Sequence, residues 1–176
     1  MPRDPLANPA PLIRRVYSYV AYRIGDGPDA EDVTSEVFER ALRYRSSYDE
    51  RRGQPLHWLL GIARRCVDDA LSGRARAPRL EPTEIEWEGD PGGDVIRRVT
   101  LAAAIRGLDE RGRDLLALRY GADLTARQIG ELLGMKTNAV EVALHRTLTR
   151  LRGELGEAAG DTRRSAEDPA PGTSPY

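Results

Sequence analysis

The stretch YDERRGQPLHWLL, residues 48–60, gathers the side chains with the most evident binding chemistry in this sequence. Acids, arginines, a glycine and a proline run directly into His57 and Trp58, where a helix is expected to begin. Guanidinium groups hold anions, and aromatic rings stack on flat ligands. The stretch is therefore either a plain surface turn or a loop that holds a ligand against the end of a helix.

A second pattern, between residues 125 and 155, fits a helix-turn-helix. That unit needs a small residue where its two helices cross and a glycine in the turn four residues later. Gly130 and Gly134 fill these two positions. An ordinary helical hairpin is the alternative. The apolar positions that fix the crossing are filled by Ile129, Leu133, Met135, Val140 and Ala143.

The second helix of such a unit enters the major groove of DNA, where its exposed side chains contact base edges and phosphates. Asparagine suits adenine, glutamate accepts from cytosine, and lysine and arginine bind phosphate or guanine. The candidate contacts are Arg127, Lys136, Thr137, Asn138, Glu141, His145, Arg146 and Arg150.

Charge alternates in sign along the chain, although the net charge is only −1. Residues 97–152 carry eleven bases and six acids, a local charge of +5 that favours contact with nucleic acid. One acidic block lies in residues 81–94. The other consists of Asp26, Asp29, Glu31, Asp32, Glu36 and Glu39.

We expect no catalytic activity, no cofactor and no metal site from this sequence. The two histidines, His57 and His145, lie in different halves of the chain, and Cys66 is the only cysteine. No nucleophile elbow, phosphate-binding glycine loop or calcium loop is recognisable. The N-terminus lacks an apolar signal segment, and no run of 18 apolar residues occurs. We therefore expect a soluble, cytoplasmic protein.

Helical periodicity predicts an all-α protein of two small domains joined by a flexible linker. The first, residues 10–76, is expected to hold three helices, the first ending at Gly25 and the third at Gly73. An acidic linker rich in proline and glycine is expected over 77–96, and a disordered tail over 156–176. The second domain, residues 97–155, is expected to hold helices over 94–107, 109–121, 125–133 and 137–155.

The two predicted helical domains, in this order along the chain, resemble those of a bacterial sigma factor of the sigma-70 class, of the extracytoplasmic-function (group IV) kind. DAEDVTSEVFERALRY (29–44) resembles the core-polymerase-binding segment of that family, and PLHWLLGIARRCVDDAL (55–71) its −10 recognition helix. Residues 108–152 resemble its −35 recognition domain. The resemblance covers about residues 10–75 and 97–153 and implies a region 2-like and a region 4-like domain.

The resemblance implies a protein that joins core RNA polymerase, directs it to a promoter and helps to open the DNA. The implied partners are the polymerase clamp helices and flap, double- and single-stranded promoter DNA, and an anti-sigma factor. The helix-turn-helix contacts would then read the −35 element. The implied polymerase contacts are Asp32, Ser35, Glu36 and Glu39. The implied −10 contacts are Tyr48, Arg51, Arg52, Gln54, His57, Trp58, Arg64 and Arg65.

Within this set, Trp58 is expected to belong to the core and His57 to be exposed. The chain departs from the family at Ser35, where glutamine is common, at Arg65, where asparagine is common, and at Glu141, where a base is common. Two other interpretations stay open: a stand-alone helix-turn-helix regulator with an N-terminal sensor domain, and a degenerate sigma-like protein that initiates weakly.

Overall fold

The computed structural model describes residues 4–76 and 94–167, and its described residues form helices and turns without a strand, which confirms the all-α prediction. Three short turns complete the fold: the 3-10 turns η1 (Arg45–Ser47) and η2 (Glu50–Arg52), and one π-helical turn, η3 (Ala117–Gly121). The helices are α1 (Pro9–Ile24), α2 (Pro28–Arg43), α3 (Pro55–Arg76), α4 (Asp94–Gly107), α5 (Glu110–Leu116), α6 (Ala126–Leu133) and α7 (Thr137–Glu167).

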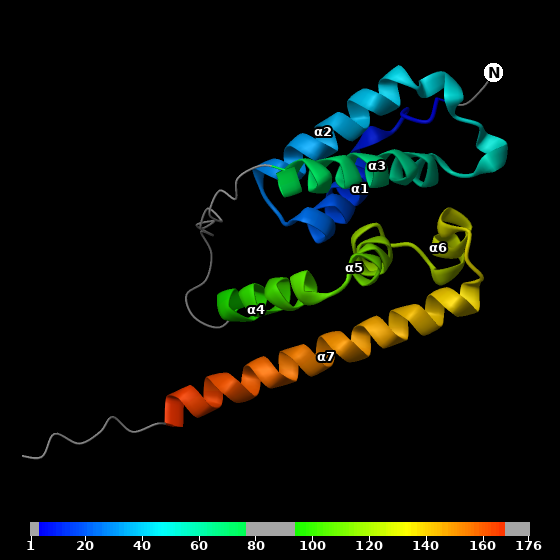
Figure 1. Ribbon diagram of the computed structural model, residues 1–176. Helices are drawn as coiled ribbons and strands as arrows, with labels where there is room; N and C mark the ends of the chain where they lie inside the picture. The colour runs from blue at the N-terminus through cyan, green and yellow to red at the C-terminus, as the bar shows by residue number, and fades with distance from the viewer. Residues whose placement is uncertain (1–3, 77–93, 168–176) are drawn as a thin grey trace, which may run out of the picture.

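Helices α1, α2 and α3 form the N-terminal bundle (Figure 1). Each begins with proline in its first turn, where the missing N–H is not needed and the fixed φ favours the helix. Val20, Val37 and Leu60 contribute one side chain each from the three helices to a fully buried core. The bundle thus buries the apolar stripes that the sequence pattern predicts.

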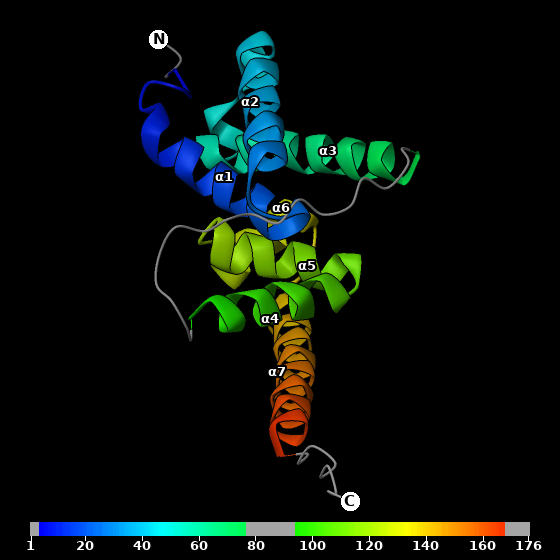
Figure 2. The same cartoon turned by 90° about the vertical axis from the view of Figure 1, so that its left-hand side faces the viewer.

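Helices α4 to α7 and η3 form the C-terminal domain, in which α7 extends as a long rod from the compact part (Figure 2). The predicted N-cap Asp109 is confirmed, because its side chain accepts a 2.9 Å hydrogen bond from the amide of Gly112. Buried residues of α5, α6 and α7, among them Leu115, Ile129 and Val140, form the core.

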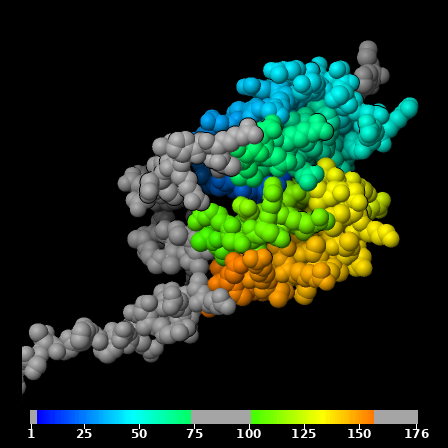
Figure 3. Space-filling view, in the orientation of Figure 1, coloured from blue at the N-terminus to red at the C-terminus, as the bar shows by residue number. Residues whose placement is uncertain are grey.

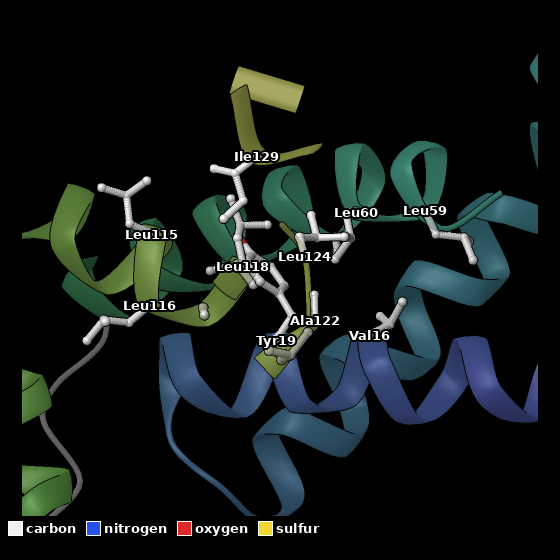
Figure 4. Packing of buried hydrophobic residues seen from close by; sticks show 14 of the residues in the cluster. Val16, Tyr19, Leu59, Leu60, Leu115, Leu116, Leu118, Ala122, Leu124 and Ile129 are labelled. Carbon is white, nitrogen blue, oxygen red and sulfur yellow. The ribbon is translucent and has the colours of Figure 1, made fainter. Parts of the chain in front are cut away.

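The two parts of the chain pack on each other, α1 of the bundle lying against α5 and η3 (Figures 1 and 3). Figure 4 shows Tyr19 of α1 beside Ala122, which follows η3. Gly121 allows this approach, since a Cβ atom there would lie 2.9 Å from the carbonyl oxygen of Ser18. We call this packing the closed arrangement.

Several element ends differ from the expected ones. Helix α3 continues through Gly73 to Arg76. Helix α4 spans Asp94–Gly107, which is its expected range, so its first residues fall in the stretch that was also expected to be linker. Helix α7 runs to Glu167 rather than to residue 155, because the sequence after residue 155 contains alanine, arginine and glutamate, which favour helix. Pro169 follows soon after, and a proline disfavours the helical conformation in the residue that precedes it. Expected linker residues 77–93 and tail residues 168–176 lie outside the described residues.

Candidate nucleic-acid and partner interface

The loop between α2 and α3 has a defined shape built by its own side chains. Asp49 caps η2 by accepting a 3.0 Å hydrogen bond from the amide of Arg51. The Tyr48 hydroxyl donates to the carbonyl oxygen of Gly53 at 3.1 Å, and the Tyr48 and Trp58 rings pack with centroids 5.6 Å apart. Gly53 has φ +146°, a conformation that favours glycine. The aromatic pair is therefore held in place without a ligand.

These residues surround a cavity of about 360 Å³ at the start of α3. Trp58 is half-buried: it packs against the core, as expected, and also lines the cavity. The expectation for His57 was wrong, because His57 is half-buried and its Nε2 is enclosed without a hydrogen-bond partner among the described residues. The lining residues are Ser47, Tyr48, Asp49, Arg52, Gly53, Gln54, His57, Trp58, Glu131 and Leu132.

The predicted arginines divide into two groups. Arg51, Arg52 and Arg65 are exposed, as is Gln54. Arg64 is instead half-buried at the contact between the domains, where its Nε and a terminal nitrogen each lie 3.2 Å from Oδ2 of Asp114. The structure therefore does not bring Arg64 to the cavity.

The acidic side of α2 is open to solvent. Asp32, Ser35 and Glu39 are exposed and Glu36 is half-buried. Arg40 pairs with Glu36 and, at 3.0 Å, with Asp69 of α3. The surface is acidic but partly neutralised by this arginine, which suits a basic partner that replaces Arg40.

Cys66 lies under this surface and is fully buried. Burial raises the pKa of its thiol to about 11, although nearby Arg40 acts in the opposite direction. The thiol is therefore a small apolar core group and not a reactive one.

The helix-turn-helix prediction is confirmed by α6, its turn and α7. Thr125 and Gln128 form a reciprocal capping box at the start of α6, and Gly134 adopts the left-handed conformation with φ +67°. A Cβ atom on Gly130 would lie 2.5 Å from the carbonyl oxygen of Met135. Gly130 is thus required by the close approach of the turn, and Gly134 by the left-handed backbone conformation at the end of α6.

The predicted DNA-contacting side chains of this unit lie on its outer surface. Arg127 pairs with Glu131 at 3.0 Å. Arg150 pairs with Glu154 at 3.2 Å and donates to the carbonyl oxygen of Gly107 at 3.4 Å, so it also ties α7 to the end of α4. Exposed without such a tie to α4 are Lys136, Thr137, Asn138, Glu141, His145 and Arg146.

The interpretation of the sequence missed the charged group at the domain contact. Arg23 is 5% exposed, and it donates to Asp114 at 2.6 Å and to the Tyr19 hydroxyl at 3.1 Å. Burial and the negative charge of Asp114 raise the pKa of Tyr19, so its hydroxyl stays protonated and donates to Asp114 at 2.7 Å. The available signal was that Arg23 continues the apolar stripe of α1, where a charge needs a buried partner.

None of the helices in the described part of the chain is long and apolar enough to cross a membrane. The described residues contain no group of three or more histidine, cysteine, aspartate or glutamate side chains that could hold a metal ion.

Comparisons with known proteins assign both halves of the chain. The family model Sigma-70 region 2 matches residues 11–77, and Sigma-70, region 4 matches residues 104–153. The ECF RNA polymerase sigma factor SigD of Mycobacterium tuberculosis is 33% identical over 172 residues, which cover 90% of this chain and 78% of SigD. SigK of Mycobacterium ulcerans is 30% identical over 151 residues and 80% of each chain.

The fold agrees with that of a solved relative. The sigma factor RpoE of Bartonella quintana, solved in complex with the anti-sigma factor NepR, superposes with a TM-score of 0.61 at 14% identity, over 82% of this chain and 92% of RpoE. The match of residues 11–77 to Sigma-70 region 2 excludes the alternative in which an unrelated sensor domain forms the N-terminal half. From both matched regions in their order and the likeness to SigD over 90% of this chain, the chain belongs to the extracytoplasmic-function family of RNA polymerase sigma factors, which direct polymerase to promoters.

Proposed function

We propose that the two matched regions divide the work of promoter recognition, with −10 recognition and melting in the N-terminal bundle and −35 recognition in α6 and α7. The observation that supports this division is the preformed cavity of Tyr48, His57 and Trp58, flanked by the exposed Arg51 and Arg52. Aromatic walls beside arginines are the elements that capture an unstacked base and its phosphates.

Melting on this proposal needs no catalytic side chain. Extruding the first base costs a few kcal/mol, and stacking on an aromatic ring returns about 1–3 kcal/mol per base. The Tyr48 and Trp58 rings are already in place, so little side-chain ordering opposes capture. His57 lines the same cavity beside the two rings.

Core polymerase engages the acidic face of α2 in this proposal, through Asp32, Ser35, Glu36 and Glu39. The exposure of Asp32, Ser35 and Glu39 beside the half-buried Glu36 supports it. A protein anti-sigma factor is also proposed as a partner, in line with the solved complex of RpoE with NepR.

Promoter opening tests the −10 assignment. A promoter duplex carrying 2-aminopurine in the −10 element gains fluorescence when its base unstacks, and wild-type holoenzyme should produce this gain. Tyr48→Ala should reduce the gain at least about tenfold, as expected for the loss of one base stack. Tyr120→Ala, at an exposed tyrosine of η3, is the matched control and should behave as wild type. Equal opening by the Tyr48 variant would remove the cavity from the −10 site.

A further inference from the structure

We infer that Val142 makes −35 recognition specific for thymine, because it packs against the C5 methyl group of that base in the major groove. The inference rests on the −35 role proposed above for α6 and α7, and it names the base that this surface selects. The sequence pattern did not single out Val142 as a contact, so its role comes from its place in the structure.

Val142 lies in the middle of the outward face of α7. Successive residues of an α-helix are about 100° apart, so Asn138, Val142 and His145 form a line along one side, which we call the outward line. All three side chains are exposed. The opposite side of α7 carries Val140 and Leu144, which are buried in the core. The outward line is therefore the part of the helix that projects furthest from its own domain.

Nothing in the described part of the chain covers the outward line. The closed arrangement leaves it open to solvent, because the N-terminal bundle packs on α5 and η3 instead. Among the described side chains of α6 and α7, Val142 is the one large apolar group that is exposed, at 42%. A single exposed valine is common on protein surfaces. This one lies on the face that a helix-turn-helix places in the major groove, where it meets base edges.

Base edges in the major groove offer a valine one apolar partner. Guanine, cytosine and adenine present only hydrogen-bonding groups there, whereas thymine also presents its C5 methyl group. Packing of Val142 against this methyl group removes apolar surface of both from water. A hydrogen-bonding group at the same place would lose its water to a side chain that cannot replace the bond. Val142 therefore favours thymine over the other bases.

Asn138 sets the register in which Val142 meets the DNA. An asparagine side chain forms a bidentate pair with N6 and N7 of adenine. Asn138 and Val142 are about one helical turn apart, or about 6 Å along the axis of α7, which is close to two base-pair steps of about 3.4 Å. The expected −35 element therefore contains an adenine and, within about two base pairs of it, a thymine.

The charged side chains beside the outward line determine how the duplex approaches it. Arg146 and Glu141 lie on opposite flanks of the line, and both are exposed. Arg146 attracts the phosphates of one strand, whereas Glu141 repels those on its own side. Arg150, about one turn beyond Arg146, is tied to Glu154 and to the end of α4. Phosphate attraction is thus concentrated in the first turns of α7, where Val142 lies.

The experiment removes one methyl group from the DNA and its partner from the protein. Holoenzyme made from core polymerase and the full-length protein first selects bound fragments from duplexes that are randomised in the −35 and −10 regions. A selected fragment is then resynthesised with uracil in place of each −35 thymine in turn, which deletes the C5 methyl group and keeps the base pair. Val142→Ser removes the apolar contact from the protein. Leu101→Ser is the matched control, since Leu101 of α4 is also an exposed aliphatic residue, at 41%.

Fluorescence anisotropy measures the affinity of each holoenzyme for each duplex. We expect uracil at one −35 position to weaken binding by wild type about fourfold, the effect of exposing one methyl group. Val142→Ser should bind the thymine duplex at least about fourfold more weakly than wild type, and it should not distinguish thymine from uracil at that position. Leu101→Ser should behave as wild type with both duplexes. Circular dichroism verifies that both variants keep their helix content.

The outcomes separate this inference from the proposed function. Three results would overturn the thymine assignment alone: a selected −35 sequence without thymine, equal binding of thymine and uracil duplexes by wild type at every −35 position, or a Val142→Ser variant as sensitive to uracil as wild type. If the selection yields a −10 sequence but no preference in the −35 region, the −35 role of α6 and α7 fails, and the role of Val142 fails with it.

Discussion

At the scale of residues, the partner of each arginine decides its role. Arg51, Arg52 and Arg64 follow one another closely in sequence, and composition alone treats them alike. The first two face solvent, whereas Arg64 is held by Asp114, fifty residues later in the chain. The loop was predictable because its aromatic and basic residues are neighbours in sequence. The pairing of Arg64 was not, because it depends on how two domains pack.

The exposed pair Arg51 and Arg52 should contact phosphate. Replacing both by alanine should weaken binding of single-stranded DNA by the holoenzyme and reduce the slope of log K against log salt by about 1.4, at about 0.7 per phosphate contact. Binding titrations at several salt concentrations measure this slope. Arg14→Ala, at an exposed site on α1, should leave it unchanged. An unaltered slope in the double variant means that the loop does not touch DNA.

The buried thiol of Cys66 makes stability depend on alkaline pH. Folding raises its pKa from 9.0 to about 11, chiefly through burial, so the native state favours the neutral thiol. Its contribution to stability is therefore complete below pH 9 and is lost as pH rises from 9 to 11. Urea unfolding at several pH values should show a steeper alkaline loss in wild type than in Cys66→Ala. Parallel curves for the two proteins would contradict the buried, neutral thiol.

At the scale of elements, the helix-turn-helix depends on one missing methyl group. Gly130→Ala forces a Cβ atom to within 2.5 Å of the Met135 carbonyl oxygen, and such overpacking costs about 1–3 kcal/mol. The variant should unfold at lower urea and lose binding to −35 duplex DNA. Gly156→Ala should instead leave stability unchanged or raise it by up to about 1 kcal/mol. Wild-type stability of the Gly130 variant would show that the helices do not cross here.

The acidic face of α2 gives a second prediction at this scale. Glu36→Lys replaces attraction to a basic partner by repulsion and should weaken binding to core polymerase at least about tenfold. Glu31→Lys makes the same charge change about 140° around the axis of α2 and should have a smaller effect. Fluorescence anisotropy of labelled protein with core polymerase measures both affinities. Equal affinities for wild type and the Glu36 variant would exclude Glu36 from the interface.

Helix types and starting points were predictable because their signals are local. Pro28, Asp109 and Thr125 mark helix starts in the sequence and do so in the structure. Stops were less predictable. Glycine in a helix costs only about 1 kcal/mol relative to alanine, so α3 continues through Gly73. Proline costs about 3 kcal/mol and is a stronger helix breaker.

At the scale of the whole molecule, the charge pattern and the two domains indicate separate surfaces for a protein partner and for DNA. We propose that acidic α2 faces a protein partner and that the basic helix-turn-helix and the arginine loop face DNA. Sequence reasoning predicted the two domains but not their contact, because the charges that join them, on Arg23 and Asp114, lie 91 residues apart.

Run-off transcription tests the central claim most directly. Purified core polymerase is incubated with a library of promoter fragments, with and without the full-length protein. We predict transcripts that start at defined positions on a subset of fragments only when the protein is present, and their loss with Glu36→Lys. RNA that is identical with and without the protein on every fragment would contradict its role in promoter-directed initiation.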